Sequence, residues 1–397
     1  MPSIKKRIIH YCQYVLGVGH YFRSLEIAAA LSDCEVIMVS GGPEVEAVLP
    51  AHVRQVLLPG LKMEHAFGPL VPTEPGRRIG RVREERAERL KRLFKEEPPD
   101  LFLVELFPFG RNLFRFELLP VLQKIHQGAY GPVKVASSVR DIIVPKYNQK
   151  QAGRRALGLL NYYFQALLVH ADPKVQTLAE TFHRADQIEI PVIHTGYVTP
   201  RPAPGAGRRK RAQLGLGPDE RLIVASIGGG GFGGELIEAV LAAFARLSEP
   251  TLRLEIFTGP LMAEADFSRL SAAAQDSPKI RVRRFAPDFI DWLAATDLSV
   301  SLGGAGTVLN TLAAGARALI YPLQNQEQPR RAEKLAAVGA VGLLSEADLD
   351  PARLADRILA ELDPRARPPA LPIDLDGAKT SAEVLSRWLE TGELGPL

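Results

Sequence analysis

Two segments of this 397-residue chain repeat one pattern, in which a short apolar run is followed by a glycine-rich turn and a helix-forming run. The first segment reads RIIHYCQYVLGVGHYFRSLEIAAAL, and the second reads RLIVASIGGGGFGGELIEAVLAAFARL. Apolar runs of strand length that alternate with helical runs predict βαβ units, and such units build parallel sheets. Further runs of both kinds follow each segment, so we expect an α/β fold with two parallel sheets.

Residues 200–217 separate the two halves and are rich in Pro, Gly and Arg without apolar periodicity, as expected for a linker. The chain also exceeds the length at which a single hydrophobic core usually stops growing. We therefore predict two Rossmann-like domains, 1–199 and 218–376, whose parallel sheets face each other across a cleft. A last amphipathic helix is expected over 377–392.

The composition argues against several classes of protein. A formal net charge of +4 gives little reason to expect nucleic acid as a partner. No run approaches the roughly 20 apolar residues that a membrane span requires. The eight histidines and two cysteines show no metal-ligand spacing. We expect a cytoplasmic protein without a metal or a cofactor.

The glycine turns favour a phosphate ligand. The run GGGGFG, 228–233, matches G-x-G-x-x-G, but neither half has the acidic residue at the end of the next strand that would hold the ribose of a dinucleotide. Glycine amides approach an anion closely, and the helix that follows directs its positive end at it. The stretch SLGGAGTVLNTLAAG repeats this arrangement, with Thr307 near the expected helix start. The alternative is an ordinary tight turn in which Thr307 only caps the helix.

A family resemblance rests on two stretches. The order SLGGAGTVLNTLAAGARALIYPLQNQEQPRRAEKLAAVGA resembles the donor-binding signature of GT-B glycosyltransferases, particularly the murein N-acetylglucosaminyltransferases that form lipid II. The opening GVGHYFRSLEIAAAL is similar to their N-terminal glycine loop, and also to that of nucleotide-sugar hydrolases carrying G-x-G-H-x-x-R. The resemblance implies a GT-B fold, with the last helix packing back on the first domain. It further implies an N-terminal acceptor-binding domain and a C-terminal domain that binds the nucleotide-sugar.

Carried over residue by residue, the resemblance implies a donor site in the second domain. Its glycine turns would face the diphosphate, a backbone segment would read the uracil edge, and an acid–amide pair would reach the sugar hydroxyls. Asn310 departs from the family, because a glutamate usually holds the ribose hydroxyls there and an amide lacks its charge. The implied residues, in that order of role, are Gly229, Gly230, Gly304, Ala305, Gly306 and Thr307, then Phe285 and Ala286, then Glu327 and Gln328, with Asn310 at the ribose.

His20 follows the first glycine turn, where an acceptor hydroxyl would approach the anomeric carbon. A neutral imidazole can take the proton of that hydroxyl, so His20 is the candidate base, and the alternative is a helix cap. Glu105 and Asp141 each end a strand, and either could orient His20, bind the acceptor or replace His20 as the base. Further candidate substrate contacts are Gly17, Gly19 and Arg23, the last by neutralising phosphate charge.

These features predict an inverting, metal-independent glycosyltransferase of the hexosyltransferase class. The expected donor is a UDP-sugar, with UDP-N-acetylglucosamine as the best single guess. The acceptor stays open, including a lipid-linked acceptor with peripheral contact at the inner face of the membrane. Two alternatives also stay open: a nucleotide-sugar hydrolase or epimerase, since His20 could equally activate water, and a non-catalytic sugar-nucleotide-binding subunit.

Overall fold

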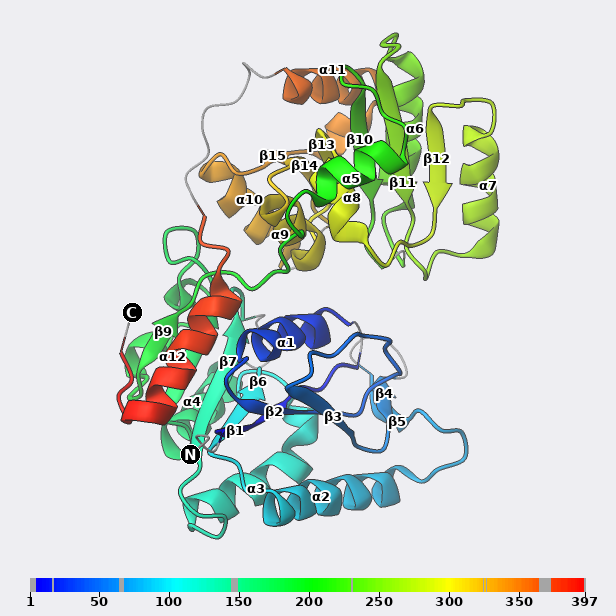
Figure 1. Cartoon of the computed structure of the whole chain (residues 1–397). Coiled ribbons are helices and arrows are strands. Elements are labelled where there is room, and N and C mark those ends of the chain that lie inside the picture. Colours follow the sequence, from blue (N-terminus) through cyan, green and yellow to red (C-terminus); the bar gives the residue numbers. More distant parts are fainter. Residues whose placement is uncertain are drawn as a thin grey trace. The chain divides into compact units, whose positions relative to one another are not determined.

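The computed structural model describes residues 5–15, 18–63, 68–143, 149–229, 231–323, 325, 327–363 and 373–395. The chain forms two compact units (Figure 1). The first unit combines Met1–Val198 with the C-terminal segment Asp374–Leu397, and the second spans Thr199–Ile373. The chain therefore leaves the first unit once and returns to it.

A parallel sheet forms the centre of the first unit. Within the described residues its strands follow the order β3-β2-β1-β6-β7-β8-β9. The chain first adds strands on one side of β1 and then on the other, so the order reverses between β1 and β6. In open parallel sheets, ligands bind at the carboxyl ends of the strands at such a switch point. The strands are β1 (Arg7–Tyr11), β2 (Glu35–Ser40), β3 (Val53–Leu57), β6 (Leu101–Glu105), β7 (Lys134–Arg140), β8 (Ala166–His170) and β9 (Val192–His194), and β4 (Leu61–Met63) pairs with β5 (Leu70–Pro72) in a separate hairpin.

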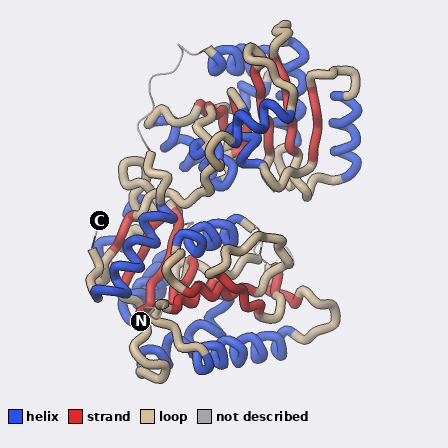
Figure 2. Tube along the Cα trace, in the orientation of Figure 1, coloured by secondary structure: helices blue, strands red, loops and turns tan. Residues whose placement is uncertain are grey.

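Helices cover both faces of this sheet, as Figure 2 shows. In Figure 1, α2 and α3 lie on the opposite side of the strands from α1. Strands buried on both faces read as nearly continuous apolar runs, which is the pattern of LFLVE in β6. The helices of this unit are α1 (Gly19–Ala30), α2 (Ile79–Glu96), α3 (Arg115–His126), α4 (Gln149–Tyr163) and α12 (Gly377–Thr391).

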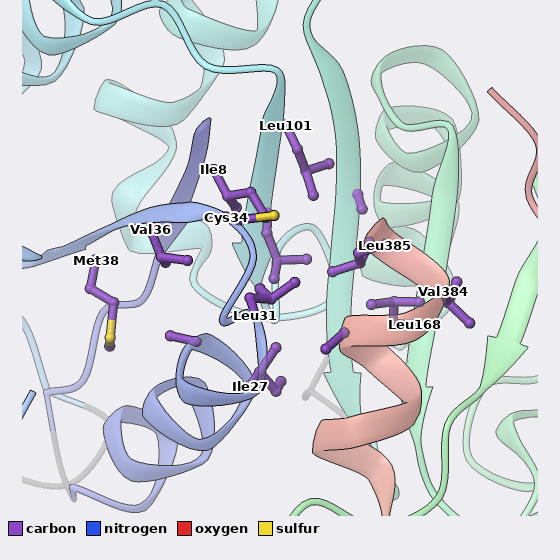
Figure 3. Packing of buried hydrophobic residues seen from close by; sticks show 14 of the residues in the cluster. Ile8, Ile27, Leu31, Cys34, Val36, Met38, Leu101, Leu168, Val384 and Leu385 are labelled. Atoms are coloured by element: carbon purple, nitrogen blue, oxygen red, sulfur yellow. The ribbon is translucent and has the colours of Figure 1, made fainter. Parts of the chain in front are cut away.

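Helix α12 comes from the C-terminal end of the chain but packs in the core of the first unit. Its buried residues Leu385 and Leu389 recur at helical spacing and form one apolar stripe. This stripe shares a core cluster with Ile27 of α1 and Leu168 of β8 (Figure 3). The helix ends before Gly392, whose φ of 81° suits the left-handed position after a helix.

The second unit repeats the architecture on a smaller sheet. Its described strands follow the order β12-β11-β10-β13-β14-β15, and the order reverses between β10 and β13. The register pairs Ser226 with Ser301, so the turns after these two strands begin side by side. The strands are β10 (Arg221–Ser226), β11 (Leu252–Phe257), β12 (Ile280–Arg283), β13 (Leu298–Leu302), β14 (Arg317–Tyr321) and β15 (Gly342–Leu343).

The helices of the second unit connect these strands. They are α5 (Ala206–Gln213), α6 (Gly234–Arg246), α7 (Glu264–Ala274), α8 (Phe289–Ala295), α9 (Ala305–Ala313), α10 (Gln328–Ala337) and α11 (Pro351–Leu362). Among the described helices of both units, none combines the length and the apolar character that a membrane span requires.

The segment 200–217 differs from the expected linker, because it contains α5 within the second unit. Lys210 forms an ion pair of 2.5 Å with Asp288 and lies over the ring of Trp292. A Cβ at Gly207 would lie 2.2 Å from the carbonyl oxygen of Ala294, so the helix approaches α8 closely. Two of the charged residues in this segment, Lys210 and Arg211, make tertiary contacts with acids of the second unit.

Candidate active site

His20 lies in the first turn of α1, at the switch point of the first sheet. Its ring Nδ1 is 2.6 Å from Oε1 of Glu105, the last residue of β6. The N-cap residue of α1 is Val18, and no side chain caps this helix. The structure therefore excludes the helix-cap alternative for His20 and places its ring against the neighbouring strand.

The contact with Glu105 determines which nitrogen of His20 is free. An ionised carboxylate only accepts hydrogen bonds, so Nδ1 must carry the hydrogen and Nε2 keeps its lone pair. Burial lowers the pKa of His20 to about 4, although the charge of Glu105 opposes this shift. The imidazole is thus neutral at neutral pH, and with 21% of its side chain exposed it remains accessible.

Glu105 is fully buried and surrounded by cations. Arg23 donates to the same Oε1 at 2.5 Å, and Nε of Arg111 lies 3.4 Å from Oε2. Burial raises the pKa of the Glu105 carboxyl, but His20 and Arg111, with Arg23, outweigh it and hold the pKa well below its usual range. An ionised Glu105 suits the orientation of His20, which was one of its three predicted roles. Arg23 is mostly buried in this contact rather than exposed as a surface arginine.

Three further buried residues lie near the cluster of His20 and Glu105. Asp141 is buried directly after β7, one strand beyond β6, and the ring of His20 hydrogen bonds to Glu105 rather than to Asp141. His10 of β1 is fully buried, and mainly burial lowers its pKa to about 4. His170 of β8 hydrogen bonds to Ser138 at 2.6 Å.

Sequence reasoning missed Arg111, His10 and His170 as neighbours of this cluster. The histidines were considered only for metal-ligand spacing, and Arg111 reaches Glu105 through a turn in which its own φ is 54°. No local pattern marks such contacts. Among the described residues, no group of three His, Cys, Asp or Glu side chains could hold a metal ion.

In the second unit, the two glycine turns at the switch point lie close together. Gly228 and Gly233 have φ values of 67° and 92°, a conformation that favours glycine. A Cβ at Gly233 would also lie 2.6 Å from the side chain of Leu302. The Cβ position of Gly228 lies 3.8 Å from Oγ1 of Thr307, so the turn after β10 borders the start of α9.

Helix α9 begins at Ala305 with Gly304 as its N-cap. Thr307 is therefore the third helical residue, and the alternative that it caps the helix is wrong. The first amides of a helix lack partners within the helix, and they favour an anion together with the positive end of the helix dipole. Gly304, Ala305 and Gly306 lie at this end of α9, beside the turn that carries Gly229.

The remaining predicted residues of the second unit lie around the same edge. Phe285 is 66% exposed and Ala286 is buried, in the loop after β12. Gln328 begins α10 and accepts a hydrogen bond from the amide of Leu323 at 3.1 Å. Glu327 pairs with Arg331 at 2.8 Å, and Asn310 accepts a hydrogen bond from the hydroxyl of Thr199 at 2.8 Å. Gly17 and Gly230 lie outside the described residues.

Comparison with known proteins finds a family model that matches most of the second unit. Residues 224–382 match the glycosyltransferase family 28 C-terminal domain. The match spans most of the second unit and continues into the first residues of α12. Solved structures support the fold over the whole chain. The glycotransferase of kitacinnamycin has a TM-score of 0.59 at 18% identity and covers 97% of this chain and 95% of its own. MurG of Acinetobacter baumannii has a TM-score of 0.55 at 17% identity and covers 95% of each chain.

Two curated relatives carry the name UDP-N-acetylglucosamine--N-acetylmuramyl-(pentapeptide) pyrophosphoryl-undecaprenol N-acetylglucosamine transferase. The protein from Rubrobacter xylanophilus is 26% identical over 280 residues, which cover 68% of this chain and 76% of that protein. The one from Rhodopseudomonas palustris is 33% identical over 150 residues, which cover 36% of this chain and only 39% of that protein. The chain is a glycosyltransferase with the GT-B fold, which confirms the family resemblance and the fold class predicted from sequence.

Proposed function

We propose that this glycosyltransferase moves a sugar from a UDP-sugar to an acceptor hydroxyl with inversion and without a metal ion. The observation that carries the proposal is the hydrogen bond between Nδ1 of His20 and Glu105, which leaves Nε2 as a free base at the switch point. The names of the curated relatives support UDP-N-acetylglucosamine as the donor. Their names also support a lipid-linked acceptor, and with it a cytoplasmic enzyme peripheral to the inner face of the membrane.

The first unit supplies the base in this mechanism. Nε2 of His20 takes the proton of the acceptor hydroxyl while the acceptor oxygen forms a bond to the anomeric carbon. The bond from that carbon to the phosphate oxygen breaks, and its electron pair leaves with UDP. A single displacement from the opposite side inverts the anomeric carbon. Glu105 stabilises the imidazolium that forms, and Arg23 and Arg111 hold Glu105 in place.

The second unit supplies the donor contacts. The amides of the turn around Gly229 and the start of α9 at Gly304–Thr307 would neutralise the diphosphate without a metal ion. Phe285 and Ala286 would contact the base, and Asn310 the ribose. Glu327 and Gln328 would contact the sugar hydroxyls, since both stand at the start of α10 beside β14.

We expect UDP release from one sugar nucleotide of a panel only when an acceptor is added, and we expect this release to persist in excess chelator. The panel should pair several nucleotides and sugars with soluble and lipid-linked acceptors. Release that needs no acceptor would identify a hydrolase, and release that stops on chelation would refute metal independence. If no sugar nucleotide binds at all, the proposed activity is wrong.

The pH dependence of transfer tests the state of His20. Because burial lowers its pKa to about 4, the neutral base persists as the pH falls below 6.5 and is lost only near pH 4. We therefore expect kcat/KM to keep its value through mildly acidic pH and then to fall on the acid side. Circular dichroism at each pH would separate this fall from unfolding. An acid limb at the ordinary histidine pKa, near 6.5, would contradict the buried dyad.

A further inference from the structure

The turn 106–111, which directly follows Glu105 at the end of β6, has an unusual backbone. Within the described part of the chain, Leu106 and Arg111 are the residues other than glycine with a positive φ, at 63° and 54°. This left-handed conformation costs free energy in a residue with a side chain, so it persists only where the surrounding structure imposes it. Two such residues therefore mark the ends of one turn beside the candidate base.

Hydrogen bonds from the neighbouring strand β7 hold this turn. The amide of Leu106 donates to the carbonyl oxygen of Ser138 at 2.8 Å. The side chain of Ser137 donates from its hydroxyl to the carbonyl oxygen of Phe107 at 2.7 Å, and both residues are fully buried. The bond from Ser138 is made by the backbone and survives any side-chain change. The bond from Ser137 depends on its hydroxyl, so it can be removed by one substitution.

The turn also closes on itself before it reaches Arg111. The amide of Gly110 donates to the carbonyl oxygen of Leu106 at 2.6 Å. A Cβ at Gly110 would lie 2.6 Å from the side chain of Leu106, so the two residues approach closely. Arg111 follows at once, and its Nε lies 3.4 Å from Oε2 of Glu105. The path of the turn therefore sets where the side chain of Arg111 starts, and with it the approach to Glu105.

Arg111 is one of two cations at Glu105. Arg23 reaches Oε1 from α1, whereas Arg111 faces Oε2 from the turn. Burial is the main cause of the low pKa of His20, and the charge of Arg111 lowers it further. A movement of Arg111 away from the cluster would therefore raise the pKa of His20. The other titratable groups that interact with Glu105 come from β1, the residue after it and β8, and they are His10, Cys12 and His170.

We propose that Ser137 is a positioning residue of this site. Its hydroxyl fixes the turn, and the turn holds Arg111 against Glu105. The inference rests on the proposed function, because Glu105 orients the candidate base His20. Ser137 carries no charge and hydrogen bonds to the backbone of the turn, so it acts on His20 through Arg111.

The titration of His20, followed by NMR, tests this role without a substrate. The ¹³Cε1 resonance of His20, one of eight histidines, is assigned by its absence from the spectrum of His20→Ala. We expect Ser137→Ala to move the titration midpoint to higher pH by about 0.5 or more, because an imidazolium is favoured when a nearby cation withdraws. The acid limb of kcat/KM should move in the same direction.

Two comparisons separate positioning from a general loss of stability. Ser381→Ala is the matched control, since it removes another fully buried serine hydroxyl of the first unit, which donates to the carbonyl oxygen of Gly377 in α12. It should leave the midpoint unchanged. Leu106→Val should move the midpoint as Ser137→Ala does, because a β-branched residue disfavours a positive φ, whereas Leu106→Asn tolerates this φ and should not. Thermal unfolding of each variant shows that it is folded.

The route through Arg111 is tested in an Arg111→Gln background. There Ser137→Ala should produce little further shift, because coupled residues are not additive. An equal shift in both backgrounds, the same shift in Ser381→Ala, or no shift in Ser137→Ala and Leu106→Val would overturn the proposal. If these shifts occur but no sugar nucleotide is turned over, the proposed activity is wrong and the link between Ser137 and His20 stands.

Discussion

Replacing His20 with alanine will lower turnover by about 10²–10⁴-fold, the contribution of a positioned general base. UDP affinity will stay unchanged, because the donor contacts belong to the second unit. The physical reason is the free Nε2 that the hydrogen bond to Glu105 leaves available. Steady-state kinetics with saturating donor and acceptor, together with UDP calorimetry, measure the two quantities separately.

His126→Ala is a matched control for this experiment, since His126 is an exposed histidine of the same unit that stacks on Tyr162. It should leave turnover unchanged. The variant Glu105→Gln keeps the shape of the side chain but removes its charge, so it should lower turnover and move the acid limb of the pH profile. Full turnover in His20→Ala would remove His20 as the base and direct the search to Asp141.

Replacing Arg86 with alanine will destabilise the first unit by about 3–5 kcal/mol, the cost of breaking a buried ion pair by removing one partner. Arg86 of α2 is fully buried and binds both carboxylate oxygens of Glu117 in α3, at 2.7 and 2.8 Å. It also donates to the carbonyl of Pro59 at 2.7 Å and to the side chain of Gln13 at 2.9 Å. Alanine leaves the Glu117 charge buried without a counter-charge.

Urea unfolding followed by tryptophan fluorescence measures this loss. The chain has two tryptophans, Trp388 in the first unit and Trp292 in the second. A Trp292→Phe background therefore reports on the first unit alone. The control Arg89→Ala, at an exposed position of the same helix, should change the free energy of unfolding by less than about 0.5 kcal/mol. A loss below about 1 kcal/mol in Arg86→Ala would show that water replaces the missing guanidinium.

The sequence by itself determined the fold class. It also indicated that the candidate residues lie at the carboxyl edges of two parallel sheets. Apolar runs of strand length, helical periodicity and glycine turns are local properties, so they can be read without knowing which segments meet. The same reasoning identified the amphipathic helix that the structure records as α12, since its apolar stripe had to be buried. Residues that follow strands, such as His20 and Glu105, could be named as candidates for the same reason.

Only the tertiary structure decided which candidates lie in contact with one another. His20 and Glu105 are 85 residues apart, and they meet because β6 lies next to β1 in the sheet, whereas Asp141 follows the strand beyond it. The contacts of α5 could not be predicted from the sequence either, because charged residues in a sequence look alike whether they face water or a distant partner. Strand order and long-range charge pairing arise from packing the whole chain, and no local pattern encodes them.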